Sequence, residues 1–372
     1  MLPFLERLLL RWEVYAPVRA GGGVEFTRLG RGGSICLDFP NSRIPPKSIF
    51  FPQKETMFRF EKDEQGFRVE PPRGLDRERI LFGMRPCDVH AMALLDRVFG
   101  GGEFHDPYYL DKRKRSVIVT IGCNQPAATC FCSSTGSGPF SRTGADLFFT
   151  DIGESYVVDI LTKKGGEVVE EGFLADASSE EVEKAERIAS EAAKSLVSFV
   201  EVEGLEQSLD RMGESPFWAR VSEKCTGCAI CTFLCPTCHC FDMADEGGEF
   251  KGKRVRHWDS CLFPLFTQQA SGHNPRPTGR ERMRQRIMHK FNYFVKSFGE
   301  AACVGCGRCI IYCPVNFDIR KVIEGIKGQE VEWERSRKVD NRGGGFCARA
   351  DETGERACGQ SLSSHAGQGD RD

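Results

Sequence analysis

Two copies of one cysteine pattern carry the clearest chemistry in the chain. The first copy reads Cys225-x2-Cys228-x2-Cys231-x3-Cys235 and precedes Pro236, and the second reads Cys303-x2-Cys306-x2-Cys309-x3-Cys313 and precedes Pro314. Three cysteines spaced three residues apart form a loop whose thiolates bind different irons of one cubane iron–sulfur cluster. Where two such runs occur, the fourth cysteine, next to the proline, ligates the other cluster. The pattern therefore indicates one-electron chemistry.

This exchange of ligands predicts two [4Fe–4S] clusters. The first cluster takes Cys225, Cys228, Cys231 and Cys313. The second takes Cys303, Cys306, Cys309 and Cys235. Tight loops of this kind need small residues where backbone N–H groups approach the sulfides, and glycines stand at 227, 305 and 307. Zinc is the alternative metal, but zinc sites usually combine two separated cysteine pairs rather than three evenly spaced cysteines.

Four further cysteines are expected to converge at one edge of a sheet. Cys87 follows the apolar run 79–84, and Cys123 follows the apolar run 117–121. If these runs are parallel strands, both cysteines leave the sheet at its carboxyl edge, where open α/β sheets place their sites. Cys130 and Cys132 come from the loop that follows. The four thiols suit a third [4Fe–4S] cluster, in which Asp88 or a cysteine of the segment 238–261 can replace one ligand. Ordinary buried cysteines are the other interpretation.

The remaining cysteines have no single assignment. Cys238, Cys240 and Cys261 can form a zinc site with His239, or they can pack around the clusters and donate weak S–H hydrogen bonds. Cys36 is interpreted as a core residue, and Cys347 and Cys358 as free thiols. No catalytic residue is assigned, because the chain contains neither a G-x-G-x-x-G fingerprint near residues 136–141 nor a Walker A motif.

The residues that precede the two motifs predict a mixed α/β domain over 1–175. Strand-like apolar runs occur at 12–16, 79–84, 117–121 and 156–161, separated by turns rich in Gly and Pro. Between the second and third runs, residues 88–98 carry apolar side chains at helical spacing. The resulting β–α–β unit predicts that runs 79–84 and 117–121 are parallel neighbours.

Three segments follow this domain. Residues 176–210 are expected to form a linker, mainly one helix over 178–200 capped by Ser178 or Ser179. Residues 211–330 hold both cysteine motifs and a helix near 278–298, which favours a mainly α-helical ferredoxin-type domain with an inserted segment. Residues 331–372, rich in Gly, Ser, Arg and Asp, are typical of a disordered tail.

Composition excludes several classes of partner. The chain has 372 residues, with 51 Lys and Arg against 53 Asp and Glu, so its net charge of −2 favours neither nucleic acid nor an anionic membrane. The basic run 276–290 lacks interleaved aromatic residues; it suits a solvated face, an acidic partner or a counter-charge to the clusters. No window approaches eighteen uninterrupted apolar residues, so we expect no membrane span. Eighteen cysteines without a secretory signal indicate metal binding in a reducing cytoplasm.

Several unusual motifs occur in a fixed order along residues 10–325. They are Arg85-Pro86-Cys87-Asp88, Asp106-Pro107-Tyr108-Tyr109, Cys130-Phe131-Cys132, Cys235-Pro236-Thr237-Cys238-His239-Cys240-Phe241, Trp258-Asp259-Ser260-Cys261 and Gly272-His273-Asn274-Pro275-Arg276. With them the sequence resembles one family of dicluster proteins, which comprises the electron-transfer subunit of anaerobic sulfite reductase and the beta subunit of the cytoplasmic sulfhydrogenases.

The resemblance implies an electron-transfer subunit rather than a complete enzyme. One implied partner is a flavin-containing, ferredoxin-reductase-like subunit that exchanges electrons with NAD(P)H. The other is a catalytic subunit, which is a sirohaem sulfite reductase in one branch and a nickel–iron hydrogenase in the other. A zinc-stabilised binding module and a self-contained flavin reductase are the alternative functions.

Overall fold

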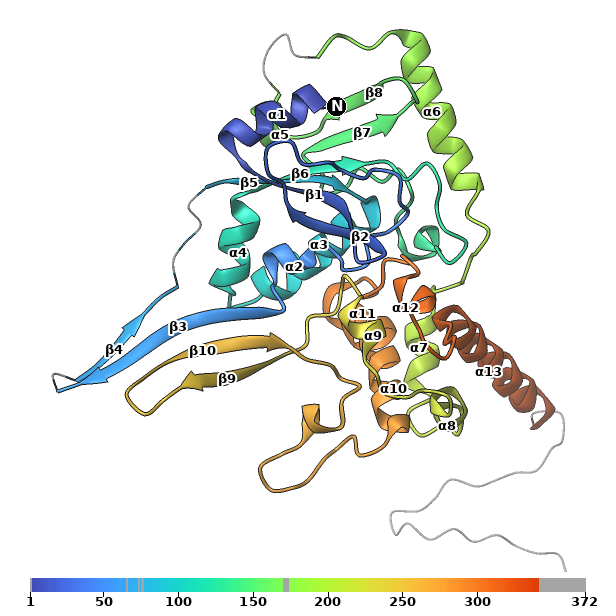
Figure 1. Cartoon of the computed structure of the whole chain (residues 1–372). Coiled ribbons are helices and arrows are strands. Elements are labelled where there is room, and N and C mark those ends of the chain that lie inside the picture. Colours follow the sequence, from blue (N-terminus) through green and yellow to red (C-terminus); the bar gives the residue numbers. More distant parts are fainter. Residues whose placement is uncertain (1, 65, 73, 75–76, 170–173, 341–372) are drawn as a thin grey trace, which may run out of the picture. The chain divides into compact units, whose positions relative to one another are not determined.

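A six-stranded sheet organises the amino-terminal half of the computed structural model, which describes residues 2–64, 66–72, 74, 77–169 and 174–340 (Figure 1). Four strands are parallel neighbours in the order β1 (Glu13–Ala20), β5 (Arg79–Met84), β6 (Ser116–Ile121) and β7 (Leu147–Asp151). The edge strands β2 (Gly23–Arg28) and β8 (Tyr156–Ile160) are antiparallel to their neighbours. The predicted parallel pairing of runs 79–84 and 117–121 is confirmed.

Helices cover both faces of this sheet, which explains why its central strands are almost wholly apolar. Helix α1 (Leu2–Arg11) packs on one face, against Ile80 and Phe82. Helices α2 (Lys47–Phe50), α3 (Pro86–Gly100) and α4 (Pro107–Lys114) pack on the other, against Leu81, Met84 and Ile118. The pairing of β5 with β6 shifts its register between Phe82 and Met84, and Gly83, with a φ of 80°, is the extra residue at this point. This bulge turns Met84 to the same face as Leu81 and leads the strand directly into α3, which carries Cys87.

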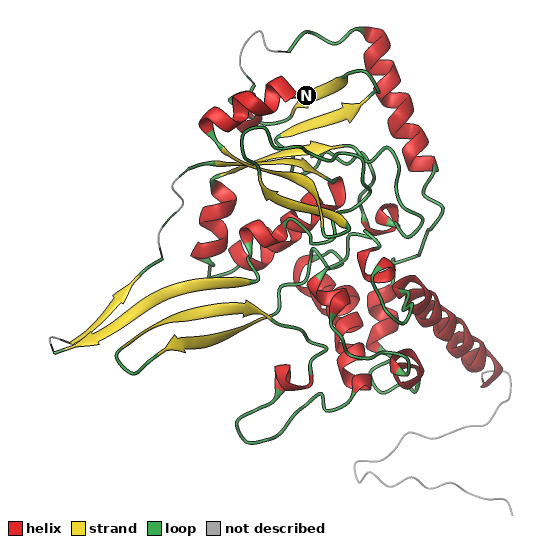
Figure 2. Ribbon diagram, viewed as in Figure 1, coloured by secondary structure: helices red, strands yellow, loops and turns green. Residues whose placement is uncertain are grey.

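A second, four-stranded antiparallel sheet extends from this body as a long ribbon (Figure 2). Its strand order is β4 (Gly66–Glu70), β3 (Lys54–Asp63), β10 (Lys251–Trp258) and β9 (Phe241–Gly247). Strands β9 and β10 lie between the two cysteine motifs in sequence, yet β10 pairs with β3 of the amino-terminal half. The prediction of a mainly helical ferredoxin-type domain is therefore not confirmed, because a hairpin occupies part of the inserted segment.

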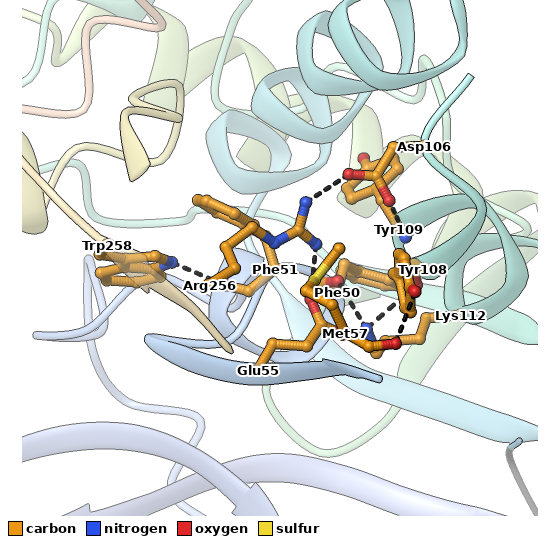
Figure 3. Close-up of polar contacts among 10 residues, drawn as sticks. All are labelled: Phe50, Phe51, Glu55, Met57, Asp106, Tyr108, Tyr109, Lys112, Arg256 and Trp258. Atoms are coloured by element: carbon orange, nitrogen blue, oxygen red, sulfur yellow. Dashed lines mark hydrogen bonds and ion pairs between the residues drawn. The ribbon is translucent and has the colours of Figure 1, made fainter. Parts of the chain in front are cut away.

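Buried polar contacts anchor the base of the ribbon (Figure 3). Arg256, only 1% exposed, forms ion pairs with Glu55 and Asp106. The indole N–H of Trp258 donates to the carbonyl of Phe51 at 3.0 Å. Two motifs that are distant in the sequence, those that begin at Asp106 and at Trp258, thus belong to one structural joint.

The remaining helices pack around a core that includes Leu209, Trp218, Ile287 and Ile323. They are α7 (Leu205–Asp210), α8 (Phe217–Ser222), α10 (Gly279–Met288) and α13 (Ile319–Asp340). A π-helical turn (His289–Tyr293) and α11 (Phe294–Phe298) continue α10, which confirms the helix predicted near 278–298. The short elements are α5 (Lys163–Gly166), α9 (Ile230–Phe233), α12 (Arg308–Ile311), η1 (Cys132–Thr135) and η2 (Pro264–Thr267).

The predicted linker helix is present as α6 (Ser179–Lys194), with a capping box between Ser178 and Glu181. It ends at Lys194, so the last part of the predicted 178–200 helix is irregular. The described residues up to 327 form one compact unit, to which the end of helix α13 from residue 328 does not belong, and the domain boundaries near 175 and 210 stay predictions. Helix α13 continues into the segment expected to be a disordered tail, and Cys347 and Cys358 lie outside the described residues.

Candidate iron–sulfur sites

The two cysteine loops share one backbone conformation. In each loop the residues on both sides of the middle cysteine have a positive φ: Gly227 (70°) and Ala229 (61°) in the first, Gly305 (59°) and Gly307 (71°) in the second. Left-handed residues between right-handed ones turn successive N–H groups toward one side and create an anion-binding nest. Ala229 accepts a conformation that usually requires glycine. The repeated, costly geometry is what two equivalent anionic clusters would need.

The loops are followed by α9 and α12, which pack against each other. Cys231 lies in α9, and Cys313 follows α12, so this packing is consistent with the first ligand set. Burial raises the pKa of the Cys303, Cys306 and Cys309 thiols, and the nearby charge of Cys235 raises the pKa of each further. The charge of Cys235 also raises the pKa of Cys231 in the first motif, so Cys235 lies near both motifs, and its assignment to the second cluster stays a prediction.

Two buried cations from the basic run lie beside these cysteines. Lys290, 3% exposed, donates from Nζ to the Cys235 sulfur at 3.2 Å. Arg286, 2% exposed, lies near Cys231 of the first motif and Cys309 of the second. Burial alone would lower the pKa of Arg286, but these thiolates raise it above its ordinary value.

The Arg286 guanidinium lacks hydrogen-bond acceptors: none of its three nitrogens has a hydrogen-bond partner among the described residues. The Phe317 ring lies 5.8 Å from the guanidinium carbon but takes no N–H hydrogen bond, and buried charged donors without acceptors cost several kcal/mol. Cluster sulfides and thiolate sulfurs accept N–H bonds and carry the opposite charge. The donors present at this position therefore fit a thiolate-bound cluster.

The four cysteines expected at the sheet edge line one small cavity. They are Cys87, Cys123, Cys130 and Cys132. Cys123, Cys130 and Cys132 are buried, and Cys87 is half-buried. Burial raises the pKa of all four thiols, that of Cys130 to about 11 and that of Cys132 to about 12. Without metal the thiols are therefore protonated, and metal binding here must release protons.

This cavity shares a wall with the second motif, because Gly305 and Cys306 also line it. The Phe131 N–H donates to the Gly305 carbonyl at 2.8 Å, and Asn41 Nδ2 donates to the Cys306 carbonyl at 2.7 Å. A Cβ at Gly305 would lie 2.4 Å from the Phe131 carbonyl oxygen. Glycine is thus required here twice, for the positive φ and for the close approach of the neighbouring loop.

Asp88, the alternative ligand of the third site, is held by another partner. It forms two contacts of 2.8 Å with the Arg308 guanidinium, and both side chains are fully buried. Arg308 Nε also donates to the Ser42 carbonyl at 2.7 Å. A bidentate pair of this kind uses both carboxylate oxygens. The geometry therefore argues against Asp88 as a cluster ligand.

The structure does not gather Cys238, His239, Cys240 and Cys261 around one point. Cys238 interacts with Cys235 and Cys261 with Cys240, whereas His239 Nδ1 bonds the Thr237 carbonyl at 3.0 Å. Within the described ranges, no three His, Cys, Asp or Glu side chains are arranged to hold a single ion. This finding counts against zinc at these four residues. Thiolates of a cubane each bind a different iron, so they need not surround one point.

Comparisons with known proteins agree with this geometry. Residues 224–317 match the family model described as a 4Fe-4S dicluster domain. The chain is 35% identical over 327 residues to the sulfhydrogenase 2 subunit beta of Pyrococcus furiosus, and the match covers 87% of this chain and 95% of that protein.

The chain belongs to the sulfhydrogenase beta subunit family. No solved structure matches it. The resemblance inferred from the motifs is thus confirmed for the sulfhydrogenase branch, and this family member is an iron–sulfur electron-transfer subunit that holds [4Fe–4S] clusters. As a subunit beta, the relative is one component of an assembly with further subunits. Of the helices described here, none is long and apolar enough to cross a membrane.

Proposed function

We propose that this subunit relays single electrons through two ferredoxin-type [4Fe–4S] clusters in residues 224–317. The ligands are those assigned above, with Cys235 and Cys313 exchanged between the motifs. The observation that carries the proposal is the buried Arg286, whose guanidinium has no hydrogen-bond partner among the described residues and whose pKa is raised by thiolates of both motifs, together with two loops of the same left-handed geometry. When bound, such clusters supply reversible one-electron reduction, and the chain adjusts their potentials through burial, N–H donors and buried cations.

A third [4Fe–4S] cluster on Cys87, Cys123, Cys130 and Cys132 would extend the relay. Its cavity includes Cys306, a ligand of the second cluster, which supports the order third, second, first along the relay. Cys123 also lines an adjoining cavity of about 380 Å³ at the carboxyl edge of the parallel strands. The third cluster would therefore lie near a hollow of the surface, where electrons can enter or leave the subunit.

The partners follow from the family. We infer a catalytic subunit of the hydrogenase or sulfur-reductase kind, because the relative is a sulfhydrogenase subunit and the match covers most of both chains. A flavin-containing subunit that exchanges electrons with NAD(P)H is the second proposed partner, and the assembly is expected in the cytoplasm. A sirohaem sulfite reductase subunit is the alternative catalytic partner. Co-purification of the tagged chain from its own host, followed by flavin and metal analysis of the complex, distinguishes these partners.

Anaerobic purification of the whole chain tests the relay. We expect a brown protein with about twelve irons and an equal amount of acid-labile sulfide, since each cubane holds about four of each. Reduction should produce electron paramagnetic resonance signals of interacting [4Fe–4S] clusters. A colourless protein that contains zinc and no sulfide would refute the relay and favour the zinc-stabilised module. Stoichiometric flavin with NADH oxidation by the isolated chain would favour the self-contained reductase.

The third cluster has its own test. Cys87→Ser and Cys132→Ser should each lower the iron content from about twelve to about eight, while the signals of the two ferredoxin-type clusters persist and show that the chain is folded. Cys36→Ser is the matched control, because Cys36 does not line the cavity and its thiol donates to the Asp38 carbonyl at 3.6 Å. Full iron in both cavity variants would leave only two clusters.

A further inference from the structure

Arg85 is a second buried arginine beside a set of cysteines, in this case those of the third site. It directly follows strand β5, opens the motif that contains Cys87, and is 5% exposed. Its guanidinium carbon lies 4.5 Å from the centre of the Phe39 ring. Every hydrogen bond described for its guanidinium goes to a backbone carbonyl, not to a carboxylate. A buried cation without a paired anion is costly, so its position requires an explanation.

The Arg85 guanidinium joins separate segments of the chain at the third site. Nη1 donates to the Gly122 carbonyl at 2.7 Å, and Gly122 directly precedes Cys123. Nη2 donates to the carbonyls of Leu37 and Phe39, at 2.6 and 2.5 Å. Because Arg85 lies directly before helix α3, its side chain connects that helix to the end of strand β6 and to the loop at 37–39. These contacts hold the backbone that carries two of the expected ligands.

One nitrogen of this guanidinium has no acceptor. Nε of Arg85 is buried, and none of the described residues accepts a hydrogen bond from it. The side chain lines the cavity of the third site. A buried donor without an acceptor is destabilising, whereas cluster sulfides and thiolate sulfurs accept N–H bonds. The free donor therefore fits a thiolate-bound cluster in this cavity.

The charge of Arg85 is isolated as well. Among the described residues that line either the cavity of the third site or the adjoining cavity of about 380 Å³, Arg85 alone carries a positive charge. It lines both cavities, so it lies in the wall between them, whereas the carboxylates of Asp38 and Asp151 line only the larger one. A cluster gains a negative charge on reduction. A buried cation in this wall therefore favours the reduced form of a cluster at the third site.

We propose that Arg85 is a positioning residue of the third site, which holds the ligand-bearing backbone, donates from Nε to a sulfur of the bound cluster and raises the reduction potential of that cluster. The inference rests on the proposed third cluster. Arg85 would act on this cluster and Arg286 on the two ferredoxin-type clusters, so separate cations would adjust the two ends of the relay. Arg85 itself takes up neither electron nor proton.

Redox titration of the whole, iron-loaded chain, followed by electron paramagnetic resonance, tests this role. The signal that Cys132→Ser removes identifies the third cluster. Arg85→Met should keep about twelve irons, lower the midpoint potential of that signal and leave the other midpoints native. Arg85→Lys keeps the charge but lacks the forked donors, so its midpoint should fall between those of the native chain and the methionine variant. Arg142→Met is the matched control, because its side chain is 53% exposed and pairs with Asp159 at 2.8 Å; it should titrate as the native chain.

The outcomes separate a role in the potential from a purely structural one. Full iron and a native midpoint of the third cluster in Arg85→Met overturn the inference. If Arg85→Met loses about four irons, Arg85→Lys decides. Full iron with a lowered midpoint in the lysine variant supports the inference, whereas loss of the same irons or a native midpoint overturns it. A native chain with only about eight irons, none of them lost in Cys132→Ser, would instead refute the third cluster itself.

Discussion

Replacing Arg286 by methionine should lower the reduction potentials of the ferredoxin-type clusters. The guanidinium is buried near Cys231 and Cys309, one from each motif, and has no hydrogen-bond partner among the described residues. A reduced cluster carries one more negative charge than an oxidised one, so a nearby cation favours reduction. Methionine keeps a long side chain of similar shape but removes both the charge and the N–H donors.

The magnitude follows from Coulomb's law. A unit charge about 8 Å from a cluster, with an effective dielectric constant of about 20, contributes about 2 kcal/mol. For transfer of one electron, about 2.3 kcal/mol corresponds to a change of about 100 mV in reduction potential. Loss of the charge alone should therefore lower the potential by about 90 mV. Loss of N–H donors to sulfur acts in the same direction. We therefore expect a fall on the order of 100 mV, shared between the clusters according to their distances from Arg286.

Redox titration followed by electron paramagnetic resonance measures this fall cluster by cluster. Arg280→Met is the matched control, because Arg280 stands on the same helix, is about one-third exposed and pairs with Glu214. It should leave the potentials nearly unchanged, since solvent screens an exposed charge. If Arg286→Met kept its full iron content and native potentials, Arg286 would not act on the clusters, and the observation that carries the proposed function would lose its force.

Three further predictions concern the joint between the cysteine motifs and the sheet. Gly305→Ala should reduce iron loading, because its Cβ would lie 2.4 Å from a neighbouring carbonyl oxygen; iron analysis measures this loss, and native loading would contradict the reading of this loop. Asp88→Asn should cost about 3–5 kcal/mol in urea unfolding, since it leaves Arg308 buried without its counter-charge, and the double change with Arg308→Met should recover part of that loss. His239 and His289 are half-buried, and the resulting loss of solvation lowers the pKa of each to about 4, so stability should be lost as the pH falls from 6.5 toward 4. His289→Gln should flatten that decline, and an unchanged pH profile of unfolding would rule out this contribution.

The site at the sheet edge could be predicted from the sequence because its cysteines are placed by a local β–α–β pattern and by the short loop that follows it. The β–α–β pattern required strands β5 and β6 to be parallel, and parallel strands bring Cys87 and Cys123 to the same edge. Cys130 and Cys132 follow Cys123 within a short loop, so these two cysteines could not lie far from the same edge. The same reasoning could not find Asn41, which bonds the Cys306 carbonyl, because no periodic signal links that loop to the distant motif.

The hairpin β9–β10 shows where sequence reasoning failed. Strand β10 pairs with β3, which lies far away in the sequence, and pairing at such separation leaves no local pattern to read. The basic run that contains Arg286 was given three alternative roles, a solvated face, an acidic partner or a counter-charge to the clusters, but no pattern in the run singled out Arg286 as buried. Its burial depends on the packing of α10 against α8 and α13, a tertiary property. Arg308 was missed for the same reason, although its position inside the second motif was a usable signal.

The shared wall between the second and third sites determines how the relay must be studied. Gly305 and Cys306 line the cavity of the third site, the Phe131 N–H bonds the Gly305 carbonyl, and the Asp88–Arg308 pair closes the same joint. Residues 1–175 alone would lack this wall and would leave Asp88 buried without Arg308 or exposed to water. Failure of that truncated chain to bind iron would therefore say nothing about the third cluster. Point variants of Cys87 and Cys132 in the whole chain keep the wall intact, so their iron content reports on the ligands themselves.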